Sequence, residues 1–217
     1  MDGGSKEKRI KWMETFDGKY QLQNLPYMKN SIDTIVIEYF LQPYGKFDFI
    51  CDIGSGLGHY IHYLKEKIGT PNCRVIGYDV SMDNCIKAKS EFPDIEFQVK
   101  NFIIKNDNFI DSSVYQNKLF ISREVVKYLW YDLDDFIYNL NLLIPPSKLF
   151  ILSNNLPTQT REQYDFDMAH EWGIKDLNML IKKIEKYFTL LRIIIQEEHE
   201  IIRPSQGQFI ALFRRNK

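Results

Sequence analysis

The feature that most constrains the fold is a glycine-rich turn between a short apolar segment and a helical pattern. Residues 47–51 have the apolar character of a buried strand, and Asp52 follows them. Glycines then occupy every second position, at Gly54, Gly56 and Gly58. Glycine permits positive φ and lets a ligand approach the main chain without a side chain in the way. The helix expected next would offer unpaired N–H groups and partial positive charge to an anionic ligand group.

Apolar segments of strand length alternate with helical patterns along the rest of the chain. Further strands are predicted at residues 74–78, 95–99, 118–121 and 148–152. Helical patterns are predicted at residues 61–68, from near 81, at 133–144 and at 174–184. This alternation predicts an α/β fold whose sheet is mostly parallel, with helices on both faces. The last two apolar runs, at residues 190–195 and 208–213, have no helix between them and predict an antiparallel C-terminal hairpin.

The chain is long enough for one domain over residues 1–217, because 217 residues with 44% hydrophobic content can bury a substantial core. Two segments fall outside the alternation. Residues 1–45 are rich in aromatic side chains and precede the first strand, and residues 153–172 form a polar and aromatic insert after the fifth strand. Ligands of open parallel sheets bind outside the carboxyl ends of the strands. We therefore expect residues 1–45 to form a helical cap or lid over a core at 46–217, with the insert at the same edge.

The glycine spacing separates this turn from two common nucleotide loops. The dinucleotide fingerprint would need a glycine where His59 stands, and a Walker loop would end in Gly-Lys-Ser/Thr. Residues 52–58 instead resemble motif I of the class I S-adenosylmethionine-dependent methyltransferases, acidic-x-Gly-x-Gly-x-Gly. With the predicted hairpin ending, the resemblance covers residues 47–217. It implies a three-layer Rossmann-like fold, S-adenosylmethionine as the cofactor and S-adenosylhomocysteine as its product.

The resemblance also implies roles for residues beyond the turn. Asp79 follows the second predicted strand, at the position where the family's carboxylate accepts hydrogen bonds from the ribose hydroxyls. Asp79 could instead cap the next helix, a role that Ser81 could also fill. After the third strand the family usually has an aspartate for the adenine amino group. Here Asn101 would accept through its amide oxygen, unless it is an ordinary loop residue, and Phe102 would lie on the purine face. The predicted cofactor-binding residues are Asp52, Gly54, Ser55, Gly56, Gly58, Asp79, Val80, Asn101, Phe102 and Ser122.

The segment after the fourth strand, residues 121–129, resembles the Ser-Glu-Val-Leu-x-Tyr-Leu segment of small-molecule methyltransferases. An amine or hydroxyl acceptor loses a proton during methylation, so a nearby carboxylate or histidine would help. Glu124 and His170 are the catalytic candidates. Glu124 has two other readings, a contact to the cofactor or an ion pair with Arg123. The predicted walls of the acceptor pocket are Tyr20, Tyr27, Arg123, Tyr128, Asn155, Arg161 and Tyr164.

The favoured function is methyl transfer to oxygen or nitrogen of a small molecule, such as a sugar, a nucleotide-linked metabolite or another biosynthetic intermediate. The alternatives are an RNA or protein methyltransferase and a catalytically silent binding subunit of the same fold. The net charge of 28 − 29 = −1 disfavours a nucleic-acid partner. Residues 24–27 match the Asn-Leu-Pro-Tyr motif of rRNA adenine dimethyltransferases, which hold a flipped base. That motif follows the fourth strand in those enzymes, so its place before the glycine turn indicates coincidence.

Other patterns bear on compartment and partners. No stretch approaches the roughly 18 consecutive apolar residues of a membrane span, and no apolar signal region follows the N-terminal charges. Three isolated cysteines suit reduced thiols in a cytoplasmic protein. His59 and His62 share a helix face, but no third ligand is in view, so no metal site is predicted. The oligomeric state stays open, with a homodimer as one option.

Overall fold

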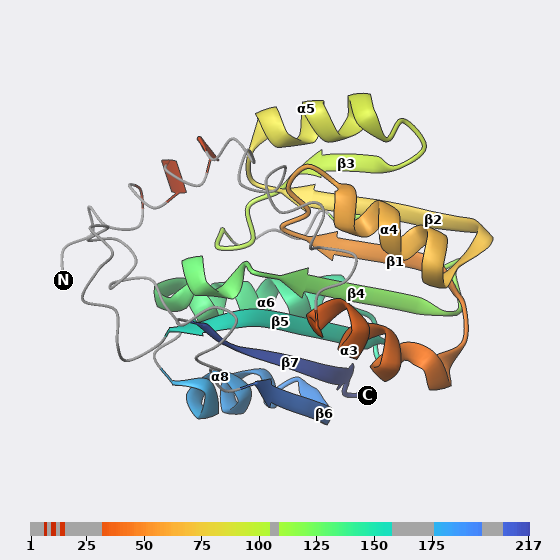
Figure 1. Ribbon diagram of the computed structural model, residues 1–217. Coiled ribbons are helices and arrows are strands. Elements are labelled where there is room, and N and C mark those ends of the chain that lie inside the picture. Colours follow the sequence, from red (N-terminus) through yellow and green to blue (C-terminus); the bar gives the residue numbers. More distant parts are fainter. Residues whose placement is uncertain are drawn as a thin grey trace.

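The computed structural model describes residues 32–104, 109–157, 176–196 and 206–217, together with Glu7, Ile10, Lys11, Glu14 and Thr15. Its centre is a seven-stranded sheet with the order β3-β2-β1-β4-β5-β7-β6 (Figure 1). The first five strands pair in parallel, whereas β7 is antiparallel to both β5 and β6. The strands are β1 (Phe47–Ile53), β2 (Gly69–Asp79), β3 (Glu96–Val99), β4 (Lys118–Arg123), β5 (Leu149–Pro157), β6 (Phe188–Gln196) and β7 (Gln206–Arg215).

Helices cover both faces of the sheet and complete three layers, as predicted (Figure 1). Side chains of successive strand residues point to opposite faces, so each strand contributes to two cores. In β1, Phe49 and Cys51 enter one core with helices α6 and α8, and Ile50 enters the other with α3 and α4. Helix α5 packs against β2 and β3. The helices are α3 (Ile32–Leu41), α4 (His59–Ile68), α5 (Met82–Glu91), α6 (Leu133–Leu143) and α8 (Leu177–Ile184), with short 3-10 turns η1 (Gln42–Tyr44), η2 (Val126–Tyr128) and η3 (Trp130–Asp132).

Local sequence signals explain where several helices begin and end. The Ser81 hydroxyl accepts a hydrogen bond from Asn84 N at 3.3 Å and so caps α5. The Asp176 carboxylate caps α8 in the same way, through Met179 N at 2.9 Å. Helix α6 ends just before Pro145, because proline cannot extend a helix. The boundaries that sequence patterns predicted therefore match the structure to within a few residues.

Two predicted boundaries differ from the structure at the strands. β2 begins at Gly69 rather than at residue 74. β5 continues to Pro157, because β7 lies beside it along its whole length and Pro157 pairs with Gln206. Residues 153–157, which we had expected to begin the insert, therefore belong to the sheet. The order of the last strands is a separate finding, since β7 rather than β6 lies next to β5. The antiparallel hairpin is confirmed, but its second strand, β7, is the one that pairs with β5.

An N-terminal helix is present in the part of residues 1–45 that the structure describes, and its role as a cap or lid stays a prediction. Three side chains of α3, Ile37, Phe40 and Leu41, are buried in the core shared with α4. Ile10 packs against the other core. Among the described residues, no helix combines the length and apolarity that crossing a bilayer would need.

Candidate cofactor site

The glycine turn joins the carboxyl end of β1 to α4 and is attached to the neighbouring strand. The main-chain N–H groups of Gly54 and Ser55 both donate to the carbonyl oxygen of Tyr78, at 2.7 and 2.9 Å. Gly54, Gly56 and Gly58 have φ values of 81°, 54° and 82°. These left-handed conformations favour glycine, since a Cβ is strained there. The alternating glycines of the sequence are therefore a conformational requirement of the turn.

Close packing beneath the turn adds a second requirement for glycine. A Cβ on Gly54 would lie 2.1 Å from Val125 Cγ2, and one on Gly58 would lie 2.5 Å from Phe97 Cζ. Gly77 in β2 faces the same region, because a Cβ there would lie 2.6 Å from Ser55 Oγ. Gly77 and Val125 were not among the predicted site residues. A glycine inside a strand is a signal for close backbone approach, and that signal could have identified Gly77.

The carboxylate of Asp79, at the end of β2, is bound to the glycine turn. Its Oδ2 accepts a hydrogen bond from Gly56 N at 2.8 Å. Its Oδ1 accepts from Ser81 N at 2.9 Å and from Asn84 Nδ2 at 3.4 Å. The α5 cap is the Ser81 hydroxyl, so Asp79 is not needed for that role. Each carboxylate oxygen has two acceptor sites, which leaves Oδ2 able to accept from a ligand hydroxyl as well.

Burial raises the pKa of Asp79, and the N–H donors Ser81 and Gly56 oppose that rise. Asp52, the acidic residue of the glycine motif, lies on β1 and is 3% exposed. Burial raises the pKa of Asp52 to about 7, while Arg123 lowers it and Asp79 raises it further. A carboxyl group that titrates near neutral pH is able to hold or release a proton under physiological conditions.

Several buried polar atoms near the strand ends have no hydrogen-bond partner in the described part of the chain, and four of them belong to predicted cofactor residues. Most buried polar atoms in folded proteins are paired, so such a group of atoms indicates a polar ligand. The residues of these four end or follow β1, β3 and β4, at the edge where the glycine turn lies. The four atoms are Asp52 Oδ1, Ser55 Oγ, Asn101 Nδ2 and Ser122 Oγ. All four belong to residues that the sequence predicted for the cofactor.

The amide of Asn101 is oriented differently from the expectation. Its oxygen accepts a hydrogen bond from Ile103 N at 3.0 Å and closes a local turn, which leaves Nδ2 for a ligand. The atom left without a partner is therefore a donor, and the acceptor role of the amide oxygen stays a prediction, since that oxygen has a second acceptor site. Phe102 is only 7% exposed and packs between Tyr78 and Phe136, with ring centroids 5.8 and 6.3 Å away. A stacking role for Phe102 on a purine stays a prediction. Val80 packs against the same core.

The end of β4 and the segment after it place Arg123 and Glu124 near the turn. The Arg123 guanidinium lies over the ring of Tyr60 in α4, 4.0 Å from its centroid. Glu124 has a φ of 62°, a conformation that non-glycine residues adopt rarely, and its N–H donates to Ser153 O at 2.8 Å. Unusual backbone of this kind gathers at functional sites. Tyr128 lies in η2 and packs against the core of α6 and α8.

The remaining predicted acceptor and catalytic residues lie wholly or partly outside the described residues. Asn155 lies in β5, opposite Gln208, and its side chain is outside the described part. The others are entirely outside it: Tyr20, Tyr27, Arg161, Tyr164 and His170. Their roles in the acceptor pocket or in catalysis stay predictions.

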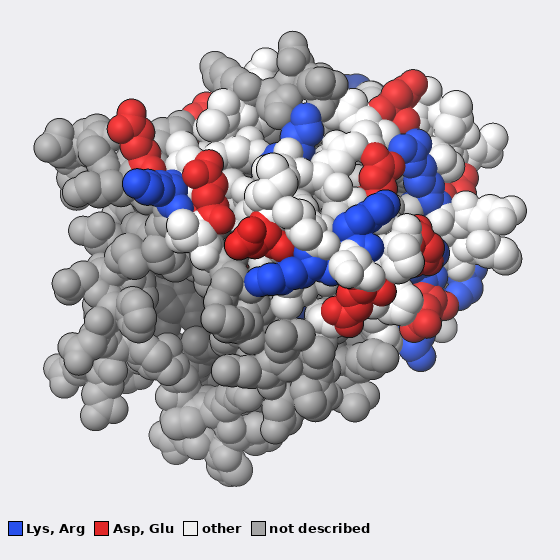
Figure 2. All heavy atoms as spheres, turned by 90° about the horizontal axis from the view of Figure 1, so that it is seen from above, with Lys and Arg blue, Asp and Glu red and all other residues white. Residues whose placement is uncertain are grey.

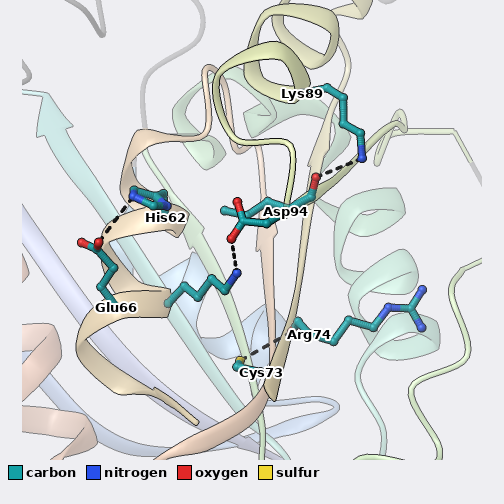
Figure 3. A network of polar contacts seen from close by, with 8 residues as sticks. His62, Glu66, Cys73, Arg74, Lys89 and Asp94 are labelled. Atoms are coloured by element: carbon teal, nitrogen blue, oxygen red, sulfur yellow. Dashed lines mark hydrogen bonds and ion pairs between the residues drawn. The ribbon is translucent and has the colours of Figure 1, made fainter. Parts of the chain in front are cut away.

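The two histidines after the turn are engaged with neighbours. His62 Nε2 lies 3.6 Å from Glu66 on the same helix, as Figure 3 shows, and its ring stacks on Phe92. His59 Nδ1 lies 3.5 Å from Glu91 of α5. Burial lowers the pKa of His59, and Glu91 opposes that shift. Within the described ranges, no three His, Cys, Asp or Glu side chains gather as a metal-ligand set.

Comparisons with known proteins agree with this geometry at the level of the fold. No protein-family profile and no curated protein sequence matches the chain. Among solved structures, it resembles the N-methyltransferase NodS from Bradyrhizobium japonicum WM9 in complex with S-adenosyl-L-homocysteine, with a TM-score of 0.66 and 16% identity over 97% of this chain and 98% of that one. A TehB-like S-adenosylmethionine-dependent methyltransferase from Corynebacterium glutamicum gives a TM-score of 0.60 and 15% identity, covering 91% and 96%.

A third similar structure carries a different name. The [4+2]-cyclase SpnF superimposes with a TM-score of 0.60 and 10% identity, over 79% of this chain and 76% of that one. Likeness at such low identity establishes architecture and leaves the reaction to the site itself. The strand order, the glycine turn and these similarities together show that the chain has the fold of the class I S-adenosylmethionine-dependent methyltransferases.

Proposed function

We propose that this protein is a methyltransferase that uses S-adenosylmethionine to methylate oxygen or nitrogen of a small molecule. The observation that carries the proposal is the hydrogen bond from Gly56 N to the Asp79 carboxylate. It joins the glycine turn after β1 to the acidic end of β2, beside the point where the strand order reverses between β1 and β4. Open α/β sheets bind their ligands at such a point.

The residues present fit the two ends of this cofactor. The methionine part of the cofactor would lie against the main chain of the turn, where the left-handed glycines carry no side chain. The Asp79 carboxylate would accept hydrogen bonds from the ribose hydroxyls. Asn101 Nδ2 would donate to an adenine ring nitrogen. Ser55 and Ser122 supply unpartnered hydroxyls from the turn and from β4. These roles account for buried polar atoms that would otherwise be costly to bury.

When bound, the cofactor supplies a methyl group that a positively charged sulfur already activates. The protein's tasks are then to align the acceptor and to exclude water, and alignment alone can contribute on the order of 7–11 kcal/mol. Glu124, held in its left-handed conformation by the bond to Ser153 O, is the described candidate for taking the acceptor's proton. Asp52 is buried near the end of β1 and would contact the cofactor through its Oδ1, which has no partner in the described part of the chain.

Calorimetric titration of the full chain with S-adenosylhomocysteine tests the cofactor assignment. We expect saturable binding that Gly56→Val abolishes, because a branched side chain would enter the turn. Gly45→Val is the matched control, since Gly45 also has a positive φ, 71°, but precedes β1 at the other end of the strands. Absence of binding to the unaltered chain would refute the proposal, and so would equal losses in the two variants.

The acceptor class is tested separately, by release of S-adenosylhomocysteine in the presence of small amines and alcohols. Transfer to RNA or protein substrates would favour the alternative enzyme. That alternative requires a basic open surface beside the glycine turn. On the described face around α5, Lys/Arg and Asp/Glu side chains are intermingled (Figure 2). Cofactor binding without turnover on any acceptor would instead favour a binding subunit or another reaction on this fold, as the name of SpnF illustrates.

A further inference from the structure

A concave site lies at the opposite edge of the sheet from the glycine turn. A cavity of about 430 Å³ opens where β4 and β5 begin and β7 ends, near the C label in Figure 1. Because β1 and β4 run in parallel, their amino ends lie a full strand length from the turn and from Arg123. The cavity is therefore separate from the candidate cofactor site.

Tertiary structure brings cationic residues from three segments to the lining of this cavity. Lys118 begins β4, Lys148 immediately precedes β5, and Arg214 pairs with Leu149 near the end of β7. Five lining residues are cationic and none is acidic: Lys118, Lys148, Arg214, Arg215 and Lys217. A protein with a net charge of −1 has no general excess of cations, so this grouping is local.

The nearby groups neutralise these charges only in part. The carboxylate of Asp48 acts on Lys118 but already accepts hydrogen bonds from Gln116 N and Asn117 N, both at 2.9 Å. Asp111 is the other acidic residue that acts on Lys118. Lys148 Nζ donates to Gln116 O at 2.7 Å, a neutral acceptor that leaves its charge uncompensated. The cavity thus keeps a positive field that an anion would satisfy.

Lys118 and Arg214 line the cavity at different depths, because Lys118 is buried and Arg214 is exposed. The Lys118 side chain is 5% exposed, and burial lowers its pKa, as does the neighbouring charge of Lys148. Placing two ammonium groups close together in a partly buried site costs free energy that a bound anion would recover. Arg214 is exposed and has no salt bridge within the part of the chain that the structure describes, so its guanidinium is available at the rim.

Arg215 is held differently from Arg214. Its Nη1 donates to Tyr187 O at 2.8 Å, and its guanidinium lies 5.7 Å from the centroid of the Tyr187 ring. Arg215 therefore contributes charge from a fixed place in the wall. Polar and aromatic groups complete the lining, among them Tyr44, Asn117, Thr189 and Asn216.

We propose that this cavity binds a small anion carrying two or more linked phosphate groups, as in a nucleoside diphosphate or triphosphate. Guanidinium and ammonium groups bind phosphate oxygens through charge-assisted hydrogen bonds. Several cations around one concave volume match a ligand with several negative charges better than a single phosphate. A concave site with a buried lysine also favours a small ligand over an extended polymer, which would contact exposed cations along a surface. Because the cavity is separate from the glycine turn, this ligand would not compete with the cofactor.

Calorimetric titration of the full chain with sodium tripolyphosphate tests the proposal, at about 50 and about 200 mM salt. We expect saturable binding that weakens at the higher salt. Arg214→Gln should weaken it about tenfold or more, because a hydrogen bond to a charged group is lost. Lys87→Gln is the matched control, since Lys87 is an exposed cation on α5 outside the cavity, and it should leave the affinity unchanged. Lys118→Met removes the buried cation of the cavity and should also weaken binding, with circular dichroism to establish that this variant is folded.

Two further titrations separate the sources of phosphate and the two proposals. Adenosine triphosphate should bind at least as tightly as tripolyphosphate, whereas a short single-stranded oligonucleotide should not displace either. No saturable binding of tripolyphosphate in the millimolar range would overturn the inference, as would equal losses in Arg214→Gln and Lys87→Gln or binding of the oligonucleotide alone. Titration of Arg214→Gln with S-adenosylhomocysteine should match the unaltered chain. Failure of the cofactor to bind any variant would refute the proposed function without touching this cavity.

Discussion

Gly54→Ala is the substitution whose cost the structure predicts most directly. Gly54 has a φ of 81°, where an L-residue loses about 1–2 kcal/mol. The added Cβ would also stand 2.1 Å from Val125 Cγ2, far inside van der Waals contact. Overpacking of this kind costs about 1–3 kcal/mol. The two effects together predict that the free energy of unfolding decreases by about 2–5 kcal/mol.

Val125→Ala separates the two effects. In a double variant it should recover much of the steric cost of Gly54→Ala, about 1–3 kcal/mol, while its own effect is about 1 kcal/mol because Val125 is half-buried. Gly45→Ala shows a backbone cost without a steric one, because a Cβ on Gly45 would have nothing within 4 Å. Gly45 combines a φ of 71° with a ψ of −149°, a region that glycine alone adopts readily, so its loss should be about 1–3 kcal/mol.

Urea unfolding followed by circular dichroism measures all four variants, and the double-mutant cycle gives the coupling between Gly54 and Val125. A coupling near zero would refute the close approach of Val125 to the turn. Titration with S-adenosylhomocysteine on the same samples then reports whether the strained turn still binds the proposed cofactor.

Three other perturbations test the site and its surroundings. Because burial raises the pKa of Asp52 to about 7, the folded state keeps a proton that the unfolded state releases above about pH 4. Its contribution to the free energy of unfolding should therefore fall from about pH 4 to about pH 7, and Asp52→Asn should flatten that dependence of the urea midpoint; an unchanged profile would contradict the assignment. Asp79→Ala leaves the N–H groups of Gly56 and Ser81 without their acceptor and should cost about 1–3 kcal/mol, with weaker binding of S-adenosylhomocysteine; unchanged cofactor affinity would contradict its role. Lys65→Ala removes an exposed ion pair with Asp94 and should cost at most about 1 kcal/mol by thermal unfolding, so a larger loss would show a structural role for that pair.

Most of the cofactor site could be predicted because its signals are local. The alternating glycines indicate a left-handed turn, and the adjoining apolar runs indicate strands, since both properties depend on a few neighbouring residues. Asp79 could be placed beside the turn because consecutive parallel strands end at one edge. The acceptor region gave no comparable pattern, and most of its predicted residues lie outside the described ranges.

Some features of the site depend on contacts that no local pattern encodes. The Asn101 amide turned its oxygen inward because Ile103 N lies within reach, and Val125 lies under Gly54 because β4 pairs with β1. Glu124 adopts a positive φ where its N–H meets Ser153 O of β5. Each of these results from a close approach between chain segments or within a single turn, which spacing alone does not reveal.

By itself, the sequence determined the kinds of elements, their approximate bounds and the glycine turn with its acidic partner. These follow from periodicity and from backbone preferences of single residues. Only the tertiary structure decided that β7 pairs with β5. As a result, Arg214 lines the same cavity as Lys118 and Lys148, although nearly a hundred residues separate Lys118 from Arg214 in the sequence. Strand order and the cavities it creates arise from long-range pairing, in which many partners satisfy the same hydrogen bonds and packing selects among them.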